Sequence, residues 1–320
     1  MRFYASKTSN ILNSMPFEPE RYAHALMLNP NYKGVDIPND TIYMMDSGAF
    51  QDVKDDQRLT FASALKRQLD FEKKLGVKAE SLVSYDRLVD EQCENGVQFK
   101  KRVDDDIGVD YVEETIKASE YFVKERDRGI LQGRNLVLSN QGCNVRQYVG
   151  CVNNILDIAE PNDIIGIGGF CIMYRSKEYR QDYYEILKHT LPSIAEKGIR
   201  RIHIFGMSIF EVLIRTDLMC KKYGIECSYD TSSAERGAVF GRLFEPDNAS
   251  IRNIFYKSEK KNGYEPSRLA HLNIKNITQF WDNWNEMGIS DKEYEIPVME
   301  NKKKITERPR TWFDEHTEIY

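Results

Sequence analysis

Short apolar runs alternate with amphipathic segments along most of this chain, and that alternation restricts its fold more than any other feature. The runs with the length and composition of buried strands are 2–5, 41–45, 81–85, 135–139, 163–168, 201–205 and 226–229, with 251–256 as a further candidate. The segments with helical periodicity between them are 61–75, 109–126, 145–159, 177–197 and 209–223. Repeated strand–helix units with nearly continuously apolar strands predict a parallel sheet covered by helices.

The number of units favours a closed barrel over an open sheet. Seven or eight units in 320 residues fit a TIM-like (β/α)8 barrel of about 250 residues. A doubly wound open sheet is the main alternative, but no G-x-G-x-x-G follows the first strand to support it. After about Tyr256 the alternation of strands and helices stops. A Lys-rich stretch is followed by a predicted helix over 274–287 and by a charged segment that contains prolines. We therefore predict an α/β protein with a barrel domain over residues 1–256 and a C-terminal helical appendage over 257–320 that packs on it.

Composition excludes several classes of protein. No apolar run approaches the ~18 residues that span a membrane, and the first residues have no apolar h-region, so we expect a cytoplasmic protein with no membrane partner. The six cysteines are scattered without a C-x-x-C pair, which predicts reduced thiols. A net charge of −5 argues against a protein whose whole surface binds nucleic acid, but it leaves room for a local basic groove. An enzyme is favoured.

Polar side chains gather where the predicted strands end, and this end of a barrel is the one that carries chemistry. The strand-end stretches are 46–51 (DSGAFQ), 84–86 (SYD), 139–142 (SNQG), 166–170 (GIGGF), 205–207 (FGM) and 228–232 (SYDTS). Asp46, Asp86 and Asp230 each follow an apolar run directly, so we expect three carboxylates on one face. A single Asp in such a place is ordinarily a helix N-cap. Three of them, accompanied by Gln141, favour a site.

These residue types indicate chemistry at a sugar carbon. Carboxylates alone can act as nucleophile and as general acid or base at an acetal-like carbon, and Asp and Gln match the hydrogen-bonding edge of a guanine-like base. Gly168 and Gly169 would let the backbone approach a planar ligand, and Phe50 and Phe205 would stack on its faces. His203 lies inside a predicted strand, and the chain has no metal-spaced cluster and no glycine-rich phosphate loop. The residues alone thus predict reaction at an anomeric carbon bonded to a purine-like base.

In this order the strand-end motifs resemble those of the tRNA-guanine transglycosylases and their DNA-acting relatives. Residues 46–51 are similar to the family's D-S-G-G-[FY]-Q, with Ala49 in place of the second Gly. The other matches are 85–86 to F-D, 140–142 to V-Q-G, 167–170 to V-G-G-L, 205–206 to M-G and 229–230 to F-D. The matches keep their order and approximate spacing over residues 46–230, which is more than half of the chain.

The resemblance implies base exchange in a nucleic acid, a reaction that needs no redox or nucleotide cofactor. Asp230 would attack C1′ of the nucleotide to form a covalent glycosyl-enzyme intermediate, and an incoming 7-deazaguanine base would then displace Asp230 with net retention. Asp46 would transfer the proton of the departing and incoming bases. The base-binding residues implied in the same way are Ser47, Phe50, Asp86, Gln141, Gly168, Gly169, Phe205 and Gly206. The target nucleotide must leave its stack to reach such a pocket.

Three departures from the family pattern refine this expectation. The tRNA-acting members carry a zinc site of three cysteines and a histidine, but no cysteine follows Cys227, so we expect no zinc-binding subdomain and a structural role for His271. Tyr174 stands where the bacterial queuosine enzymes have a Glu that recognises an aminomethyl group, which favours 7-cyano-7-deazaguanine as the incoming base. The P-T-R segment after the nucleophile is replaced by residues 232–236. Loss of the zinc module with the catalytic face retained resembles the DNA-modifying branch found in bacteria and their viruses, and the compact chain fits a viral version acting in the host cytoplasm.

The sequence therefore predicts a DNA-guanine transglycosylase whose partners are DNA, guanine and a 7-deazaguanine base. The residues expected to contact the nucleic acid are Arg236, Lys257, Lys260, Lys261 and Arg268, the last four within a basic stretch from 252 to 275. A homodimer or helper proteins are compatible with this prediction. The alternatives are a divergent tRNA-guanine transglycosylase, a non-catalytic nucleic-acid-binding subunit of the same fold, and an unrelated barrel hydrolase whose aspartates are caps.

Overall fold

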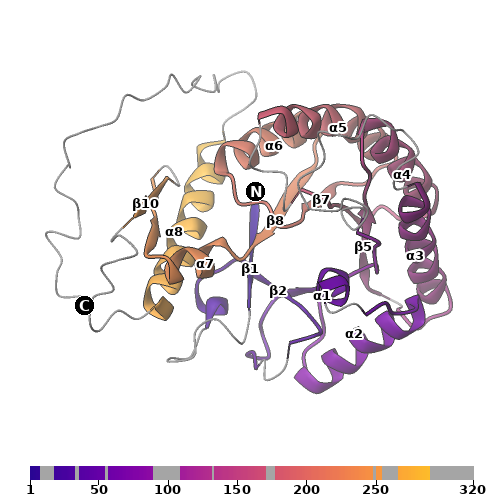
Figure 1. The fold of residues 1–320 in the computed structure, drawn as a ribbon, viewed down its shortest axis with the longest axis horizontal. Helices are drawn as coiled ribbons and strands as arrows, with labels where there is room; N and C mark the ends of the chain where they lie inside the picture. Colours follow the sequence, from indigo (N-terminus) through magenta and orange to yellow (C-terminus); the bar gives the residue numbers. More distant parts are fainter. Residues whose placement is uncertain are drawn as a thin grey trace, which may run out of the picture.

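Eight parallel strands close into a barrel in the computed structural model, which describes residues 1–7, 18–32, 36–54, 57–88, 109–131, 133–170, 177–247, 250–253 and 266–288 (Figure 1). The strands are β1 (Arg2–Ser6), β2 (Ala25–Leu28), β3 (Tyr43–Met45), β4 (Ser81–Val83), β5 (Asn135–Asn140), β6 (Ile164–Ile167), β7 (Arg201–Ile204) and β8 (Glu226–Thr231). Neighbours pair in chain order, and β8 pairs with β1 so that Asp230 lies opposite Tyr4. The chain thus has the predicted TIM-like (β/α)8 barrel, and its closure excludes the open sheet.

Helices form a ring outside the strands (Figure 1). They are α1 (Ala49–Lys54), α2 (Phe61–Leu75), α3 (Val109–Asp127), α4 (Val145–Ile158), α5 (Lys177–Glu196), α6 (Phe210–Lys222), α7 (Ser233–Val239) and α8 (Pro266–Met287), with a 3-10 turn η1 at Pro19–Arg21. All five helical segments predicted from periodicity are confirmed, and their ends lie within one residue of the predicted ends. The predicted caps of α2 are also confirmed, since Thr60 Oγ1 accepts the N–H of Ser63 and Gly76 adopts a φ of 70°. None of the described helices combines the length and apolar character needed to cross a membrane.

Alternation along the strands divides the core into two layers. Leu136 and Leu138 of β5 belong to the large cluster between strands and helices, whereas Val137 packs inside the barrel with Tyr4 and Met44. Because successive side chains of a strand point to opposite faces, every second residue of each strand faces the interior. A residue two or four positions beyond an inward-facing strand residue therefore lies at the open end of the barrel, on the side of its interior.

The prediction of strand positions is wrong in two places. The strand β2 was not predicted, because Ala25–Leu28 consists of Ala, Leu and Met, which favour helices and carry little β signal. The candidate strand 251–256 is not a barrel strand: β10 (Ile251–Asn253) pairs antiparallel with β9 (Arg242–Phe244) outside the barrel. Ile251 and Asn253 are exposed, as expected for a hairpin and not for a parallel strand covered on both faces.

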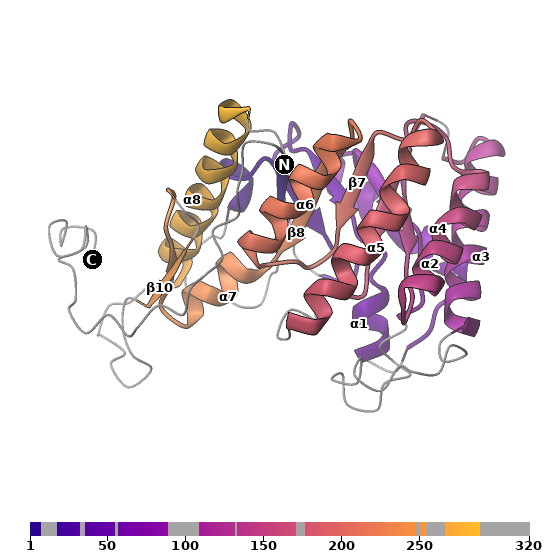
Figure 2. The same cartoon turned by 90° about the horizontal axis from the view of Figure 1, so that it is seen from above.

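The C-terminal helix α8 closes the outer ring next to β1 and β8. It begins at Pro266, two turns before the predicted start at 274, and Figure 2 shows it beside α7 and β10 at one edge of the molecule. The indole of Trp281 is fully buried and donates to Tyr229 Oη of β8 at 2.7 Å. The helix predicted in the appendage thus packs on the barrel. Residues 254–265 and 289–320 lie outside the described residues, and the boundary at 256/257 stays a prediction.

Candidate active site at the mouth of the barrel

An open pocket of about 1080 Å³ lies where the barrel strands end. Its lining contains all of the residues that the sequence predicts for catalysis and base binding, namely Asp46, Ser47, Phe50, Asp86, Gln141, Gly168, Gly169, Phe205, Gly206 and Asp230. The barrel geometry explains this convergence. Asp46 lies two residues beyond Met44 and Gln141 four beyond Val137, and both apolar residues pack inside the barrel.

Asp46 is a partly buried carboxyl group whose two oxygens have different partners. The backbone N–H of Ser47 donates to Oδ1 at 2.8 Å, and Asn29 Nδ2 donates to Oδ2 at 3.1 Å. Burial raises the pKa of Asp46 to about 7, helped by the nearby charges of Asp230 and Asp86, while the backbone hydrogen bonds oppose the shift. A carboxyl group with this pKa can both give and take a proton near neutral pH.

The hydrogen bonds that the described residues make to the Asp230 carboxylate reach one of its two oxygens. The backbone N–H of Gly206 donates to Oδ1 at 2.9 Å, and His203 Nε2 lies 3.2 Å from the same atom. Within the described part of the chain, no hydrogen bond is made to Oδ2. The side chain is 15% exposed and lines the pocket. Asp230 is therefore oriented through Oδ1, and none of the described residues donates to its Oδ2, an arrangement that suits a nucleophile.

His203 is a site residue that the sequence interpretation missed. It is fully buried in β7, with Nδ1 2.9 Å from Ser228 Oγ and its ring edge-on to Phe205 at 4.9 Å. A carboxylate oxygen only accepts hydrogen bonds, so the imidazole acts as the donor in this contact and helps to fix the orientation of the Asp230 side chain. The period-two alternation of β7 could have revealed it, because 203 and 205 share the inward face. Asn29 was missed because β2 was missed.

A second cluster of hydrogen bonds arranges Asp86. Ser47 Oγ donates to Asp86 Oδ1 at 3.1 Å, and Gln141 Nε2 donates to Oδ2. On the adjoining wall the hydroxyl of Tyr148 donates to Gly168 O at 2.7 Å. A Cβ at Gly169, whose φ is +81°, would lie 2.5 Å from that hydroxyl, so this wall requires glycine. The pocket therefore offers carboxylate, amide and backbone groups side by side, a set that matches a base edge with several donors.

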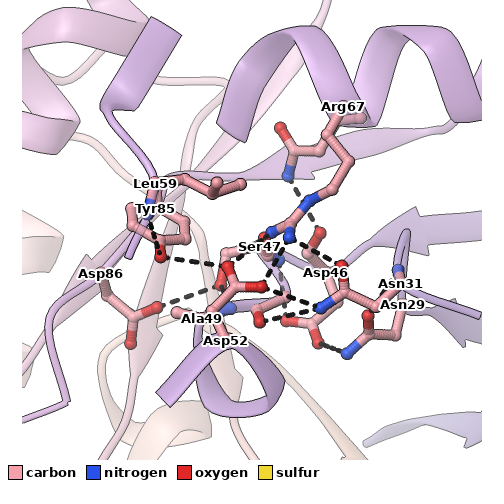
Figure 3. Close-up of polar contacts among 12 residues, drawn as sticks. Asn29, Asn31, Asp46, Ser47, Ala49, Asp52, Leu59, Arg67, Tyr85 and Asp86 are labelled. Carbon is pink, nitrogen blue, oxygen red and sulfur yellow. Dashed lines mark hydrogen bonds and ion pairs between the residues drawn. The ribbon is translucent and has the colours of Figure 1, made fainter. Parts of the chain in front are cut away.

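The loop that carries Asp46 is fixed from behind by a buried ion pair (Figure 3). Arg67 of α2 binds both oxygens of Asp52, at 2.6 and 2.9 Å, and donates to Ser47 O at 2.7 Å. Tyr85 donates its hydroxyl to Asp52 Oδ2 at 3.0 Å. Gly48 has a φ of +78°, and a Cβ there would lie 2.6 Å from Arg67 Nη2. Ala49 begins α1, where alanine is well suited, so its departure from the family motif is accommodated locally.

The two phenylalanines expected to stack on a base occupy different depths. Phe205 is partly buried and packs against the interior cluster of the barrel, so that it forms part of the pocket floor. Phe50 lies on α1 and is 56% exposed, which places it at the pocket edge. Both line the pocket.

The residues predicted to contact nucleic acid have different outcomes. Arg236 of α7 is exposed and lines the pocket. Arg268 is exposed in the first turn of α8 and is not part of the pocket lining. Lys257, Lys260 and Lys261 lie outside the described residues, as does Tyr174.

His271 has a structural contact. Its Nε2 accepts the backbone N–H of Glu18 at 2.8 Å, and its ring lies 5.6 Å from that of Tyr22. Burial lowers its pKa, which favours the neutral, accepting imidazole. Across the described residues, no three His, Cys, Asp or Glu side chains are grouped so as to hold a metal ion. His271 thus ties α8 to η1, in accord with the role expected for it.

Comparison with protein-family models and with curated proteins gives no match for this chain. The function must therefore be argued from the geometry and chemistry of the pocket and from the motifs that line it.

Proposed function

We propose that this protein is a DNA-guanine transglycosylase that exchanges guanine in DNA for a 7-deazaguanine base. The observation that carries the proposal is the pairing of two different carboxyl groups in one pocket. Asp46 has a pKa of about 7, and Asp230 is oriented through Oδ1 alone. Two carboxyl groups in different environments, one suited to proton transfer and one to attack, are what substitution at an anomeric carbon requires.

In the first half-reaction, Asp230 Oδ2 attacks C1′ of the target nucleotide and the C1′–N9 bond breaks. The electron pair of that bond leaves with guanine, and the protonated carboxyl of Asp46 supplies a proton to the departing base. In the second half-reaction, Asp46 removes a proton from the incoming base, whose nitrogen attacks C1′ and displaces Asp230. Two inversions give net retention, and the order of events gives ping-pong kinetics.

Asp86, Gln141 and the backbone at Gly168 provide the proposed base recognition. The carboxylate of Asp86 would accept from the N–H groups of a guanine-type edge, and Gln141 orders that carboxylate by donating to Oδ2. Guanine and 7-deazaguanines share this edge, so one pocket can hold both bases in turn. The proposal of 7-cyano-7-deazaguanine as the incoming base rests on Tyr174, as argued from the sequence.

DNA is proposed over tRNA because residues 228–320, where the resemblance would place the three cysteine ligands of the zinc site, contain no cysteine. Cys143, Cys151, Cys220 and Cys227 are buried, and the cysteines are proposed to be reduced thiols of a cytoplasmic protein. The target nucleotide is proposed to be single-stranded or flipped, because the reacting carboxyl groups lie at the mouth of a barrel where a stacked base cannot reach.

An exchange assay distinguishes the candidate functions. Wild-type protein is incubated with radiolabelled guanine and either single-stranded DNA, duplex DNA or tRNA, and label in the polymer is measured. We expect labelled guanine to be incorporated into DNA, and we expect this incorporation to be lost when unlabelled 7-cyano-7-deazaguanine is added. Label in tRNA alone would instead identify a divergent tRNA-guanine transglycosylase. Binding of nucleic acid without any exchange would identify a non-catalytic subunit, and neither binding nor exchange would leave an unrelated barrel hydrolase.

A further inference from the structure

One edge of the pocket mouth combines exposed apolar and cationic side chains. We call the set Arg236, Phe240, Arg242 and Ile251 the α7–β10 rim; all of them line the pocket. Phe240 is 46% exposed and Ile251 is 50% exposed, whereas most of the apolar side chains that the structure describes are buried. Exposed apolar side chains that lie together and are rimmed by polar residues commonly mark a binding surface.

The rim carries positive charge that the described residues do not neutralise. No ion pair or hydrogen bond from the guanidinium of Arg236 or Arg242 is found in the described part of the chain, and Arg242 lies over the Phe240 ring at 5.8 Å. The neighbouring Arg252, by contrast, pairs with Glu245 at 2.9 Å. The interior of the pocket holds Asp46, Asp86 and Asp230. The sign of the charge thus reverses from the inside of the pocket to this edge.

The α7–β10 rim is held rigidly by α8. Asn273, fully buried, donates from Nδ2 to Ala234 O at 3.0 Å and to Arg242 O at 2.9 Å, and its Oδ1 accepts the N–H of Phe244 at 2.9 Å. One side chain therefore ties α7, β9 and α8 together. A surface fixed in this way loses little conformational freedom when it binds a ligand.

We propose that the α7–β10 rim binds the nucleotides adjacent to the target nucleotide of a single DNA strand. Arg236 and Arg242 bind backbone phosphates, and Phe240 stacks on a neighbouring base with Ile251 beside it. This ligand fits both signs of charge, because its base donates hydrogen bonds to the carboxylates inside while its phosphates meet the cations outside. Positively charged grooves with aromatic platforms are the usual means of holding single strands. The inference rests on the proposed function only in that the pocket takes a base.

The test measures binding of a fluorescein-labelled single-stranded deoxyoligonucleotide by anisotropy. Phe240→Ala is expected to weaken binding by about 5- to 150-fold, the range found for loss of one base stack, and Phe240→Trp is expected to retain it. Arg236→Gln and Arg242→Gln should each reduce the slope of log Kd against log salt by about 0.7. The matched controls are Ile130→Ala and Arg200→Gln, since both residues are exposed and belong to neither the pocket lining nor the rim.

The exchange assay separates this proposal from the proposed function. In the exchange assay, Phe240→Ala is expected to raise KM for DNA, while kcat and the KM for the incoming base stay unchanged. If Phe240→Ala binds the oligonucleotide as tightly as wild type, the rim proposal is wrong even if exchange proceeds. A change in oligomeric state, seen by sedimentation, without a change in DNA affinity would also overturn it and identify a protein interface. If the wild type binds the oligonucleotide through Phe240 but exchanges no base, the proposed function fails and the rim proposal stands.

Discussion

Ionisation of the Asp46 carboxyl group is unfavourable. The group is partly buried, and it shares its pocket with the carboxyl groups of Asp230 and Asp86. Its pKa of about 7 lies above the ordinary value of 3.8. Between these two values the folded protein keeps a proton that the unfolded chain releases, so the wild type loses stability as pH rises from about 4 to 7. Above pH 7 the whole penalty is present.

Asp46→Asn removes this penalty, because an amide does not ionise. We expect the variant to be more stable than wild type at pH 8, by up to ~4 kcal/mol at about 1.36 kcal/mol for each pKa unit, with little difference at pH 4. Urea unfolding at several pH values measures the gap, and the exposed Asp40→Asn serves as control. A stability gap that does not vary with pH would contradict the assigned environment of Asp46. The same variant should slow exchange by about 100- to 10,000-fold if Asp46 transfers the proton.

His203 acts on Asp230 as a positioning residue. Its Nε2 lies 3.2 Å from Asp230 Oδ1, and a hydrogen bond to a charged group contributes about 1.5–3 kcal/mol. We expect His203→Ala to lower kcat by about 10- to 150-fold with KM for DNA unchanged, and His203→Gln, whose Nε2 can reach a similar position, to recover part of the loss. Steady-state kinetics with oligonucleotide substrate measures both. If His203→Gln were as impaired as His203→Ala, a donor at Nε2 would not be what positions Asp230, and the assigned role of His203 would be wrong.

At the scale of elements, the α1 loop depends on α2. Arg67 reaches from α2 to bind Asp52 and Ser47 O, so the position of Asp46 is determined by a helix that contributes no residue to the pocket lining (Figure 3). Removing one partner of a buried ion pair leaves an uncompensated charge. The network is therefore sensitive to change at either end.

Arg67→Ala is expected to destabilise the protein by about 3 kcal/mol, the lower end of the range for a buried pair, because Arg67 remains 20% exposed. Arg67→Lys keeps the charge but loses the bidentate contact with Asp52, so its stability should lie between those of Arg67→Ala and the wild type. Lys66→Ala on the solvent face of the same helix is the control, with a change within about 0.5 kcal/mol. Urea unfolding measures all three. Equal stability of Arg67→Ala and Lys66→Ala would show that the ion pair does not hold the loop.

The five helices α2 to α6 could be predicted almost to the residue because periodicity and caps are local signals. Thr60 and Gly76 terminate α2 by hydrogen bonds and backbone angles that involve only nearby residues. The strands β2 and β10 could not be assigned in the same way. Ala25–Leu28 becomes a strand because β1 and β3 lie on either side of it, and Ile251 is excluded from the barrel because β8 already pairs with β1. Both outcomes depend on tertiary pairing.

At the scale of the whole molecule, the barrel brings together residues that lie far apart in the sequence. Asp46 and Asp230 are separated by most of the barrel in sequence, yet both line one pocket because β3 and β8 end at the same face. Strand-end positions therefore made the pocket lining predictable. His203 was not predictable in this way because it lies within a strand. Of the α7–β10 rim only Arg236 was predicted, because the rest of the rim depends on how α8 fixes the hairpin.

The net charge of −5 also takes on meaning at this scale. The carboxyl groups of the pocket contribute to it, while Arg236 and Arg242 stand at the mouth. The small net charge of the chain is therefore the sum of a negative pocket interior and a positive pocket mouth. This separation of charge suits a nucleotide whose base lies inside and whose phosphates lie outside.

Trapping of the covalent intermediate measures the proposed chemistry most directly. Protein is incubated with a labelled single-stranded oligonucleotide, denatured, and analysed by gel and by intact mass. We expect an adduct with the mass of protein plus oligonucleotide minus guanine, attached at Asp230, released by a chase with 7-cyano-7-deazaguanine, and absent from Asp230→Ala and from mixtures with tRNA alone. If Asp230→Ala still exchanges labelled guanine into DNA, Asp230 is not the nucleophile and the proposed mechanism is wrong.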